Sequence, residues 1–304
     1  MEMKQILEMC VQYKASDVHI LVGVPPMLRL HGKLLTVPES SVVTPAVSEE
    51  LVNSILSEQQ RELLKVDREL DFSHSLPGGA RFRVNVYYEK GNVAAALRYI
   101  PAEISTLEEL HLPPIIGQLT EIKQGLILVT GPTGHGKSTT MAAMIKRINE
   151  GRSEHIITIE DPVEYVHSPV KSIISQRELH ADTHSWGVAL KSVLREDPNV
   201  VLVGEMRDYE TIEAALTIAE TGHLVLATLH TNSAAQTIDR IVDVFPEKEQ
   251  QQIRGQLALS LGAVISQRLI ASEDGERIAV VEVLIANPAV RSLIRDGKSH
   301  MLSN

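Results

Sequence analysis

The sequence is poor in cysteine: among its 304 residues the only one is Cys10. A single thiol excludes a disulfide within the chain and a zinc site of four cysteines, and it fits a reducing cytoplasm. Long apolar runs are also missing. No stretch approaches the roughly 18 apolar residues of a membrane-spanning helix, and Met1–Gln5 lacks the basic segment that opens a signal peptide. We therefore expect a cytoplasmic protein that is peripheral to any membrane through its partners.

Basic residues are in deficit. Lysine and arginine total 29 against 39 aspartates and glutamates, which gives a formal net charge of −10. A protein whose main partner is nucleic acid usually carries a basic excess or stripe, so this balance argues against nucleic acid as a partner. With 43% hydrophobic residues, a chain of this length can bury the cores of two domains.

The segment Gly131–Ser138 has the spacing of a phosphate-binding loop, G-x-x-x-x-G-K-S. It follows the apolar run Leu126–Val129 and precedes a helical run that begins at Thr139, so strand, glycine-rich turn and helix occur in the required order. Backbone N–H groups and the helix N-terminus attract phosphates. Lys137 is placed to reach the β- and γ-phosphates, and the Ser138 hydroxyl to ligate Mg²⁺. A chance glycine-rich turn would lack these flanks, so we expect ATP to bind here.

The next strand is predicted over residues 155–159, and two carboxylates follow it, Glu160 and Glu164. The carboxyl end of a strand close to a phosphate loop is where α/β sheets bind ligands. Either carboxylate could position Mg²⁺ or the attacking water, or the cluster could simply cap a turn. The residues alone leave these alternatives open.

Two further apolar segments, 199–203 and 223–229, predict strands buried on both faces. Glu205 follows the first, at a point where the usual Mg²⁺-linked aspartate is missing, so it is better placed to polarise water than to ligate metal. The second has His223 at its start and His230 at its end. A lone histidine is usually structural; the position of His230 at the crevice end of the strand is what suggests contact with the γ-phosphate.

The first hundred residues predict a mixed α+β domain. Helical spacing covers residues 3–13 and 45–64, and alternating or apolar segments predict strands near 15–20 and 27–30. A hairpin is predicted over residues 80–100.

Three arginines, Arg81, Arg83 and Arg98, fall on one face of that hairpin. A solvated polar surface is the commoner explanation for such a face, and the pattern alone favours it. The alternative is a set of arginines aimed at a phosphate held by another domain or subunit. Prolines punctuate residues 101–115, where we place the domain boundary, with a short helix over 105–110.

The C-terminal part continues with predicted helices over 208–220 and 233–243, and with a long helix from Pro246 to Leu269. A turn around Asp274-Gly275 leads to a strand over 278–284. The last helix, residues 289–296, presents Arg291 and Arg295 opposite its apolar edge. His180 and His184 are spaced like a zinc-binding pair, but no third ligand is evident, so we expect no zinc.

In this order, the motifs resemble those of the secretion ATPases of type II and type IV secretion and type IV pili, most closely the PilT-type pilus retraction ATPases. The likeness covers nearly the whole chain. The matching segments are Ala15–His19, Pro25–Arg29, Gly131–Ser138 as Walker A, Ile159–Tyr165 as the acidic Asp box, Leu202–Asp208 as an atypical Walker B, and Gly222–Asn232 as the His box.

The resemblance implies an α/β protein with a PAS-like α+β domain over residues 1–100, a linker over 101–115 and a RecA-like P-loop ATPase domain over 116–304. It implies a homohexamer with ATP between the two domains. Residues expected to hold ATP and Mg²⁺ are Gly131, Thr133, Gly134, Gly136, Lys137, Ser138, Thr139 and Glu160.

The resemblance also assigns roles in turnover. Glu205 activates water, Glu164 supports Mg²⁺ or water, and His223 and His230 sense the nucleotide state. It makes Arg81, Arg83 and Arg98 phosphate-sensing arginines. This interpretation replaces the solvated polar surface that the pattern alone favours.

The resemblance favours retraction over assembly. Assembly and secretion ATPases usually carry a four-cysteine zinc element, which one cysteine cannot build, and residues 289–296 look like a segment typical of retraction ATPases. We expect an ATP hydrolase that powers pilus retraction and twitching motility through an inner-membrane pilus platform protein, at the inner face of the bacterial inner membrane. The alternatives are a pilus assembly or type II secretion ATPase, a RecA-type DNA translocase, and a nucleotide-binding subunit without turnover. Family members usually continue past the point that matches Asn304, so a truncated C-terminus is expected.

Overall fold

The fold is taken from a computed structural model that describes residues 1–100, 103–271 and 277–303. The chain divides into two compact units, Met1–Glu103 and Ile104–Asn304, and each has its own hydrophobic core. Residues 101–102 of the expected linker and the turn expected around Asp274-Gly275 lie outside the described residues. Among those described, no helix is long and apolar enough to cross a bilayer.

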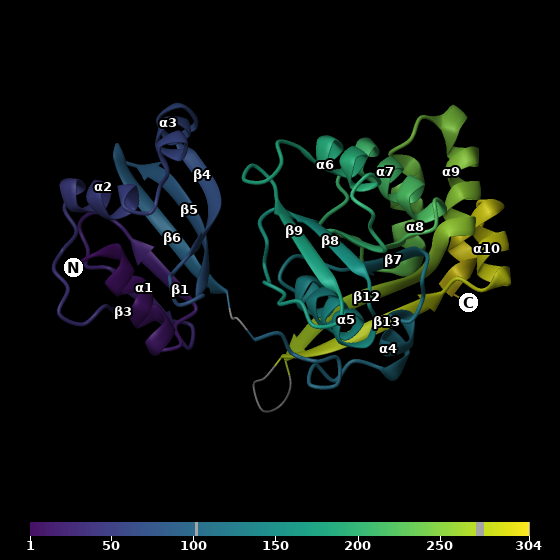
Figure 1. Ribbon diagram of the computed structural model, residues 1–304, viewed down its shortest axis with the longest axis horizontal. Coiled ribbons are helices and arrows are strands. Elements are labelled where there is room, and N and C mark those ends of the chain that lie inside the picture. Colours follow the sequence, from purple (N-terminus) through teal and green to yellow (C-terminus); the bar gives the residue numbers. More distant parts are fainter. Residues whose placement is uncertain (101–102, 272–276, 304) are drawn as a thin grey trace. The chain divides into compact units, whose positions relative to one another are not determined.

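The N-terminal unit is a six-stranded antiparallel sheet with the strand order β3-β2-β1-β6-β5-β4 (Figure 1). Alternation along the strands gives it one apolar face: Phe82, Val84 and Val86 are fully buried, whereas Arg83 between them is exposed. Side chains from three helices complete that core. The elements are α1 (Met3–Gln12), β1 (Asp17–Ile20), β2 (Met27–Leu30), β3 (Lys33–Thr36), α2 (Pro45–Asn53), α3 (Glu58–Asp67), β4 (Glu69–Ser75), β5 (Arg81–Glu89) and β6 (Asn92–Ile100).

The single helix predicted over 45–64 is wrong, because α2 and α3 are separate helices. Ser57 begins the second one. Its hydroxyl accepts a hydrogen bond from the backbone N–H of Gln60, whose side chain binds back to the Ser57 N–H. This reciprocal cap stabilises a new helix start within the apolar periodicity that suggested one continuous helix.

The C-terminal unit is a seven-stranded sheet with the order β13-β12-β7-β11-β10-β8-β9, parallel except for β13. Helices cover both faces, with α4 and α5 on one and α6 to α10 on the other (Figure 1). The elements are α4 (Pro114–Leu119), β7 (Gly125–Thr130), α5 (Lys137–Gly151), β8 (His155–Glu160), β9 (Ile173–Glu178), α6 (Trp186–Val193), β10 (Val200–Val203), α7 (Tyr209–Glu220), β11 (Leu224–Leu229), α8 (Ala234–Asp243), α9 (Glu247–Ser260), β12 (Leu261–Ala271), β13 (Arg277–Ile285), α10 (Pro288–Arg295) and the 3₁₀ helix η1 (Ser299–Ser303). This arrangement confirms the predicted α/β fold class.

The long helix predicted from Pro246 to Leu269 is also wrong. It ends at Ser260, and the chain continues directly into β12, which pairs in parallel with β7. Leu261 and Val264 are fully buried in this strand; their helical spacing from Ile253 and Leu257 is coincidental. This apolar run is a strand because it is buried in the sheet. Its periodicity alone cannot distinguish a strand from a helix.

Smaller differences concern short segments. The helix predicted over 105–110 is a hydrogen-bonded turn that does not continue, with the Leu110 N–H bound to the Thr106 carbonyl. Five elements, β3, β4, α4, β9 and η1, were not predicted at all. These pieces are only four to seven residues long, too short for a clear period.

Candidate nucleotide-binding site

The parallel strands of the C-terminal unit bring the predicted catalytic segments to one edge of the sheet. Strands β7, β11, β10 and β8 are consecutive neighbours in parallel register. Their carboxyl ends therefore lie side by side. Gly131–Ser138 follows β7, His230 follows β11, Glu205 comes after β10, and Glu160 closes β8.

The phosphate loop is shaped by glycines at close approaches. Gly131 has φ +141°, and a Cβ at this position would lie 2.2 Å from the carbonyl oxygen of Gln267. Only glycine can therefore connect β7 to the loop here. Thr133 and Gly134 lie in the turn of the loop, and Gly136 directly precedes α5.

The Lys137 side chain is buried against this loop. Its Nζ donates hydrogen bonds to the carbonyl oxygens of Gly131 at 2.8 Å and Pro132 at 3.0 Å. Burial lowers the pKa of Lys137, and the charges of Glu205 and Glu164 oppose that shift. The ammonium thus binds the loop carbonyls, and a polyphosphate would be a stronger partner for it than those carbonyls.

The Glu205 carboxylate is held by two side chains, Arg207 and His230. Its Oε1 lies 2.8 Å from His230 Nε2, and its Oε2 accepts a hydrogen bond from Arg207 Nη2 at 2.8 Å. Burial opposes ionisation, but the hydrogen bonds and charges of Arg207 and His230 outweigh it and lower the pKa of Glu205. The carboxylate is therefore ionised and oriented, as a group that accepts a proton from water must be.

His230 connects that carboxylate to the phosphate loop. While Nε2 faces Glu205, Nδ1 lies 3.4 Å from the hydroxyl of Thr133. One imidazole therefore contacts both the loop and the candidate base. His223 is not brought to this edge: its carbonyl accepts from the N–H of Gly125 at the start of β7, and its ring Nδ1 lies 3.1 Å from the Ile218 carbonyl. The length of β11, about 20 Å, separates the two histidines.

The two carboxylates after β8 have different surroundings. Glu160 accepts hydrogen bonds from the Thr158 hydroxyl at 2.7 Å and the Glu164 N–H at 3.3 Å, and burial raises its pKa. It organises the turn that carries Glu164. The charge of Glu164 favours the protonated form of Lys137, and its role toward Mg²⁺ or water stays a prediction.

Two contacts here involve residues that the sequence did not single out. Tyr165 hydrogen-bonds through its hydroxyl to the Thr139 hydroxyl at 2.9 Å, which links the Asp box to the first turn of α5. Arg207 is two residues beyond Glu205 within the Walker B segment. Its closeness to Glu205 in the sequence is the only feature from which their contact could have been predicted. In the described part of the chain, no three His, Cys, Asp or Glu side chains are arranged to hold a metal ion.

The predicted arginines lie together in the N-terminal unit. Arg83 and Arg98 are directly opposite each other on β5 and β6, and Asp17 of β1 is opposite Arg98. The Asp17 carboxylate accepts a hydrogen bond from Arg98 Nε at 3.0 Å and pairs with Arg29 Nε at 3.5 Å. Arg81 Nη2 donates to the Ser73 hydroxyl at 2.7 Å.

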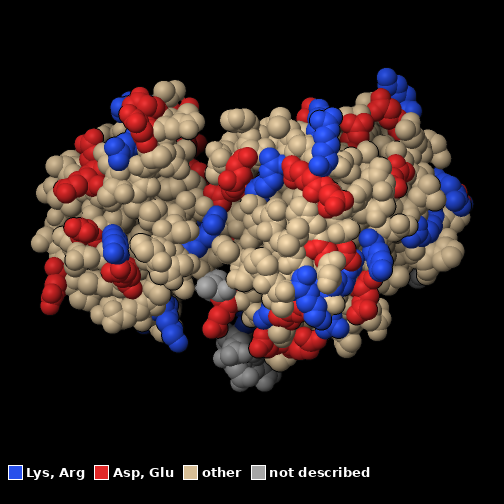
Figure 2. Space-filling model, viewed as in Figure 1, with Lys and Arg blue, Asp and Glu red and all other residues tan. Residues whose placement is uncertain are grey.

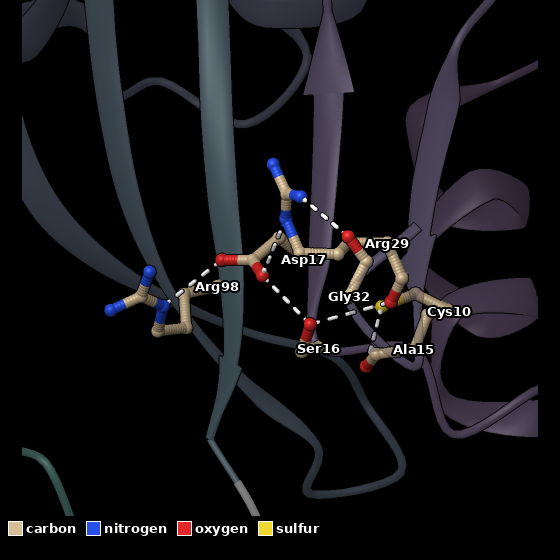
Figure 3. Close-up of polar contacts among 7 residues, drawn as sticks. All are labelled: Cys10, Ala15, Ser16, Asp17, Arg29, Gly32 and Arg98. Carbon is tan, nitrogen blue, oxygen red and sulfur yellow. Dashed lines mark hydrogen bonds and ion pairs between the residues drawn. The ribbon is translucent and has the colours of Figure 1, made fainter. Parts of the chain in front are cut away.

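Figure 3 shows how Asp17 anchors this group. Burial would raise its pKa, but hydrogen bonds from Ser16 and Arg98 and the charges of Arg98 and Arg29 lower it. Arg98 is engaged through Nε, and its two terminal nitrogens point away from Asp17 (Figure 3). Its side chain is 72% exposed, so the guanidinium can receive an anion while it stays anchored.

The only cysteine has a structural role nearby. Cys10 is fully buried, and its thiol donates to the Ala15 carbonyl (Figure 3). Burial, with the charge of Asp17, raises its pKa to about 12. A thiol in this state is inert.

Comparisons with known proteins agree with this architecture. The family model described as "Type II/IV secretion system protein" matches residues 2–276. The type IV pilus retraction ATPase PilT of Pseudomonas aeruginosa is 47% identical over 298 residues, 98% of this chain and 86% of that protein. A twitching motility protein of Neisseria gonorrhoeae is 54% identical over 276 residues, 90% of this chain and 73% of that protein.

Among solved structures, the pilus retraction motor PilT with bound ADP superposes with a TM-score of 0.95 at 48% identity, covering 100% of this chain and 88% of that one. A protein with this fold and phosphate loop is a P-loop ATPase. The chain belongs to the type II/IV secretion system protein family, and within it is similar to the pilus retraction ATPases.

Proposed function

We propose that this protein is the ATP-driven motor of type IV pilus retraction. The observation that carries the proposal is the meeting of Lys137, Glu205 and His230 at one sheet edge, next to a glycine loop shaped for phosphates. The similarity to a pilus retraction ATPase over 98% of the chain supports the biological role.

The chemistry follows from these residues. In the ATP-bound state the loop N–H groups receive the phosphates, and Lys137 exchanges the carbonyls of Gly131 and Pro132 for phosphate oxygens. The Ser138 hydroxyl, at the start of α5, and Glu164 would hold Mg²⁺, which would neutralise phosphate charge. Glu205 takes a proton from the attacking water. His230, in contact with both Thr133 and Glu205, couples loop occupancy to the position of that base.

The remaining elements concern assembly. We infer that the PAS-like N-terminal unit contributes Arg81, Arg83 and Arg98 to phosphate sensing in a homohexamer. The anchored guanidinium of Arg98 supports this role. His223 stays a predicted sensor of the nucleotide state, although the structure places it at the other end of β11. The ring would act on an inner-membrane platform protein of the pilus, from the cytoplasmic face of that membrane.

The test is a count of surface pili on cells that lack the gene and on the same cells with it restored. Excess pili together with lost twitching motility are expected, because pili would be built but not withdrawn. Bald cells would overturn the proposal in favour of pilus assembly. A purified wild-type protein without phosphate release would overturn the ATPase function itself.

A further inference from the structure

The end of β12 lies alongside the phosphate loop. In the parallel pairing with β7, Ser266 is opposite Thr130, the last residue of that strand. Gln267, Arg268 and Leu269 therefore continue past the end of β7, next to residues 131–136. The sequence-based prediction assigned this segment to the end of a helix, so it gave the segment no part in the site.

Gln267 is 2% exposed, and both polar ends of its side chain are used. Nε2 donates a hydrogen bond to the His135 carbonyl oxygen in the loop at 2.8 Å. Oε1 accepts one from the Thr140 hydroxyl on α5 at 2.7 Å. The loop also packs closely on this residue, because a Cβ at Gly136 would lie 2.9 Å from Gln267 Nε2.

A second contact from β12 holds the same loop residue. The backbone N–H of Leu269 donates to His135 Nδ1 at 2.9 Å. Both the carbonyl and the ring of His135 are thus directed toward β12. Ser266, one residue before Gln267, does not take part: its hydroxyl pairs with the Thr130 hydroxyl at 2.9 Å, within the sheet.

The orientation of the His135–Gly136 peptide follows. In a trans peptide the C=O and the following N–H point in opposite directions. Because Gln267 binds the His135 carbonyl, the Gly136 N–H is turned away from β12. In the sheet order, β12 is on one side of β7, and β11 and β10, with His230 and Glu205 at their ends, are on the other. A phosphate that meets this N–H must therefore lie on the side of the loop away from β12.

We propose that Gln267 is a positioning residue of the phosphate loop, which holds the Gly136 N–H toward the phosphates of a nucleoside di- or triphosphate. The inference rests on the proposed function, since it concerns the same nucleotide site. It specifies that Gln267 acts through the loop and touches neither the nucleotide nor the attacking water. Affinity for ADP and ATP should depend on it alike, and the hydrolytic step should not.

The experiment measures Mg-ADP binding by titration calorimetry, and kcat and KM for ATP, in the full chain. In Gln267→Glu an acceptor replaces the donor opposite the His135 carbonyl, while the bond from Thr140 can persist. We expect Kd for ADP and KM for ATP to rise about tenfold, which corresponds to the binding free energy lost with one hydrogen bond. The kcat should stay within about threefold of wild type. Gln267→Leu removes both bonds at similar volume and should weaken ADP to a similar degree.

Ser266→Ala is the matched control. It removes a buried hydroxyl pair from the same strand without touching the loop, so it should lower the melting temperature but leave Kd within about twofold. If both Gln267 variants bind ADP like wild type, or if Ser266→Ala weakens ADP as much as they do, the inference is overturned. If Gln267→Glu does not fold, Gln267→Leu decides. A wild-type protein that does not bind ADP would instead overturn the proposed function.

Discussion

The two units arrange their charges differently. At the loop edge of the C-terminal unit, Lys137 binds loop carbonyls and Glu205 is shared between Arg207 and His230, so the charged groups are satisfied internally. On the sheet of the N-terminal unit, three arginines stand in one row with a single carboxylate, in the order Arg29, Asp17, Arg98, Arg83. We propose that the first arrangement is a prepared catalytic centre. The second has excess positive charge and is suited to an anion supplied from outside the unit.

The distribution of charge over the surface agrees with this contrast. The chain carries a net charge of −10, and acidic and basic side chains are interspersed over the face in Figure 2. A row of three guanidinium groups is therefore a local exception, and not part of a generally basic surface. The comparison predicts that loss of the Glu205 carboxylate at the loop edge affects the chemical step, whereas changes in the arginine row affect the response to phosphate.

The largest effect is expected from Glu205→Gln. The amide keeps the size of the side chain but cannot accept the proton of the attacking water, so kcat should fall about a hundredfold or more. The KM for ATP should change little, since the loop and Lys137 are intact. Steady-state phosphate release measures both quantities.

Glu62→Gln is the control for this variant, because it removes an exposed carboxylate on α3 that pairs with Lys65. It should leave hydrolysis unchanged. Near-normal turnover in Glu205→Gln would exclude Glu205 as the base and would remove the catalytic half of the comparison.

A smaller effect is expected from the arginine row. Arg98→Ala should lower kcat/KM for ATP about tenfold, because a charge-assisted contact to phosphate is lost. Asp17→Ala should lower it severalfold, because Arg98 loses the carboxylate that orients its Nε. The double variant should be no worse than Arg98→Ala alone, since Asp17 acts on the reaction through Arg98.

Lys90→Ala, which removes an exposed cation in the turn between β5 and β6, is the control for charge alone. Additive losses in the double variant would contradict the anchoring role of Asp17. They would indicate that Asp17 contributes only to the stability of the sheet.

The sequence was most informative where function constrains spacing. The loop Gly131–Ser138, Glu205 and His230 were all placed correctly at strand ends, because alternating buried strands and helices force their carboxyl ends to one edge. Prediction from the sequence failed where tertiary packing determines whether a segment is a helix or a strand. Nothing local distinguishes the strand Leu261–Ala271 from a helix, and so the contact of Gln267 with the loop could not be foreseen.

The same boundary between α9 and β12 explains Arg291, one of two arginines predicted to lie on the polar side of the last helix. The final carbonyls of a helix need donors, and α9 passes into β12 with no intervening loop that could supply them. Arg291 does so: Nη1 binds the Ala258 and Leu259 carbonyls, and Nη2 binds that of Leu261 at 2.9 Å.

Arg291→Met should therefore destabilise the C-terminal unit with little direct effect on hydrolysis. Methionine keeps the aliphatic stem but leaves these carbonyls without their donors, which costs about 2 kcal/mol and lowers the melting temperature of this unit by roughly 5 °C. Arg295→Met on the same helix is the matched control, since that side chain is exposed and donates to the Ser292 hydroxyl at 3.4 Å. Its effect should stay within about 0.5 kcal/mol. Equal melting temperatures for the two variants would show that Arg291 does not cap α9, and that the helix-to-strand junction is stabilised by packing of the sheet alone.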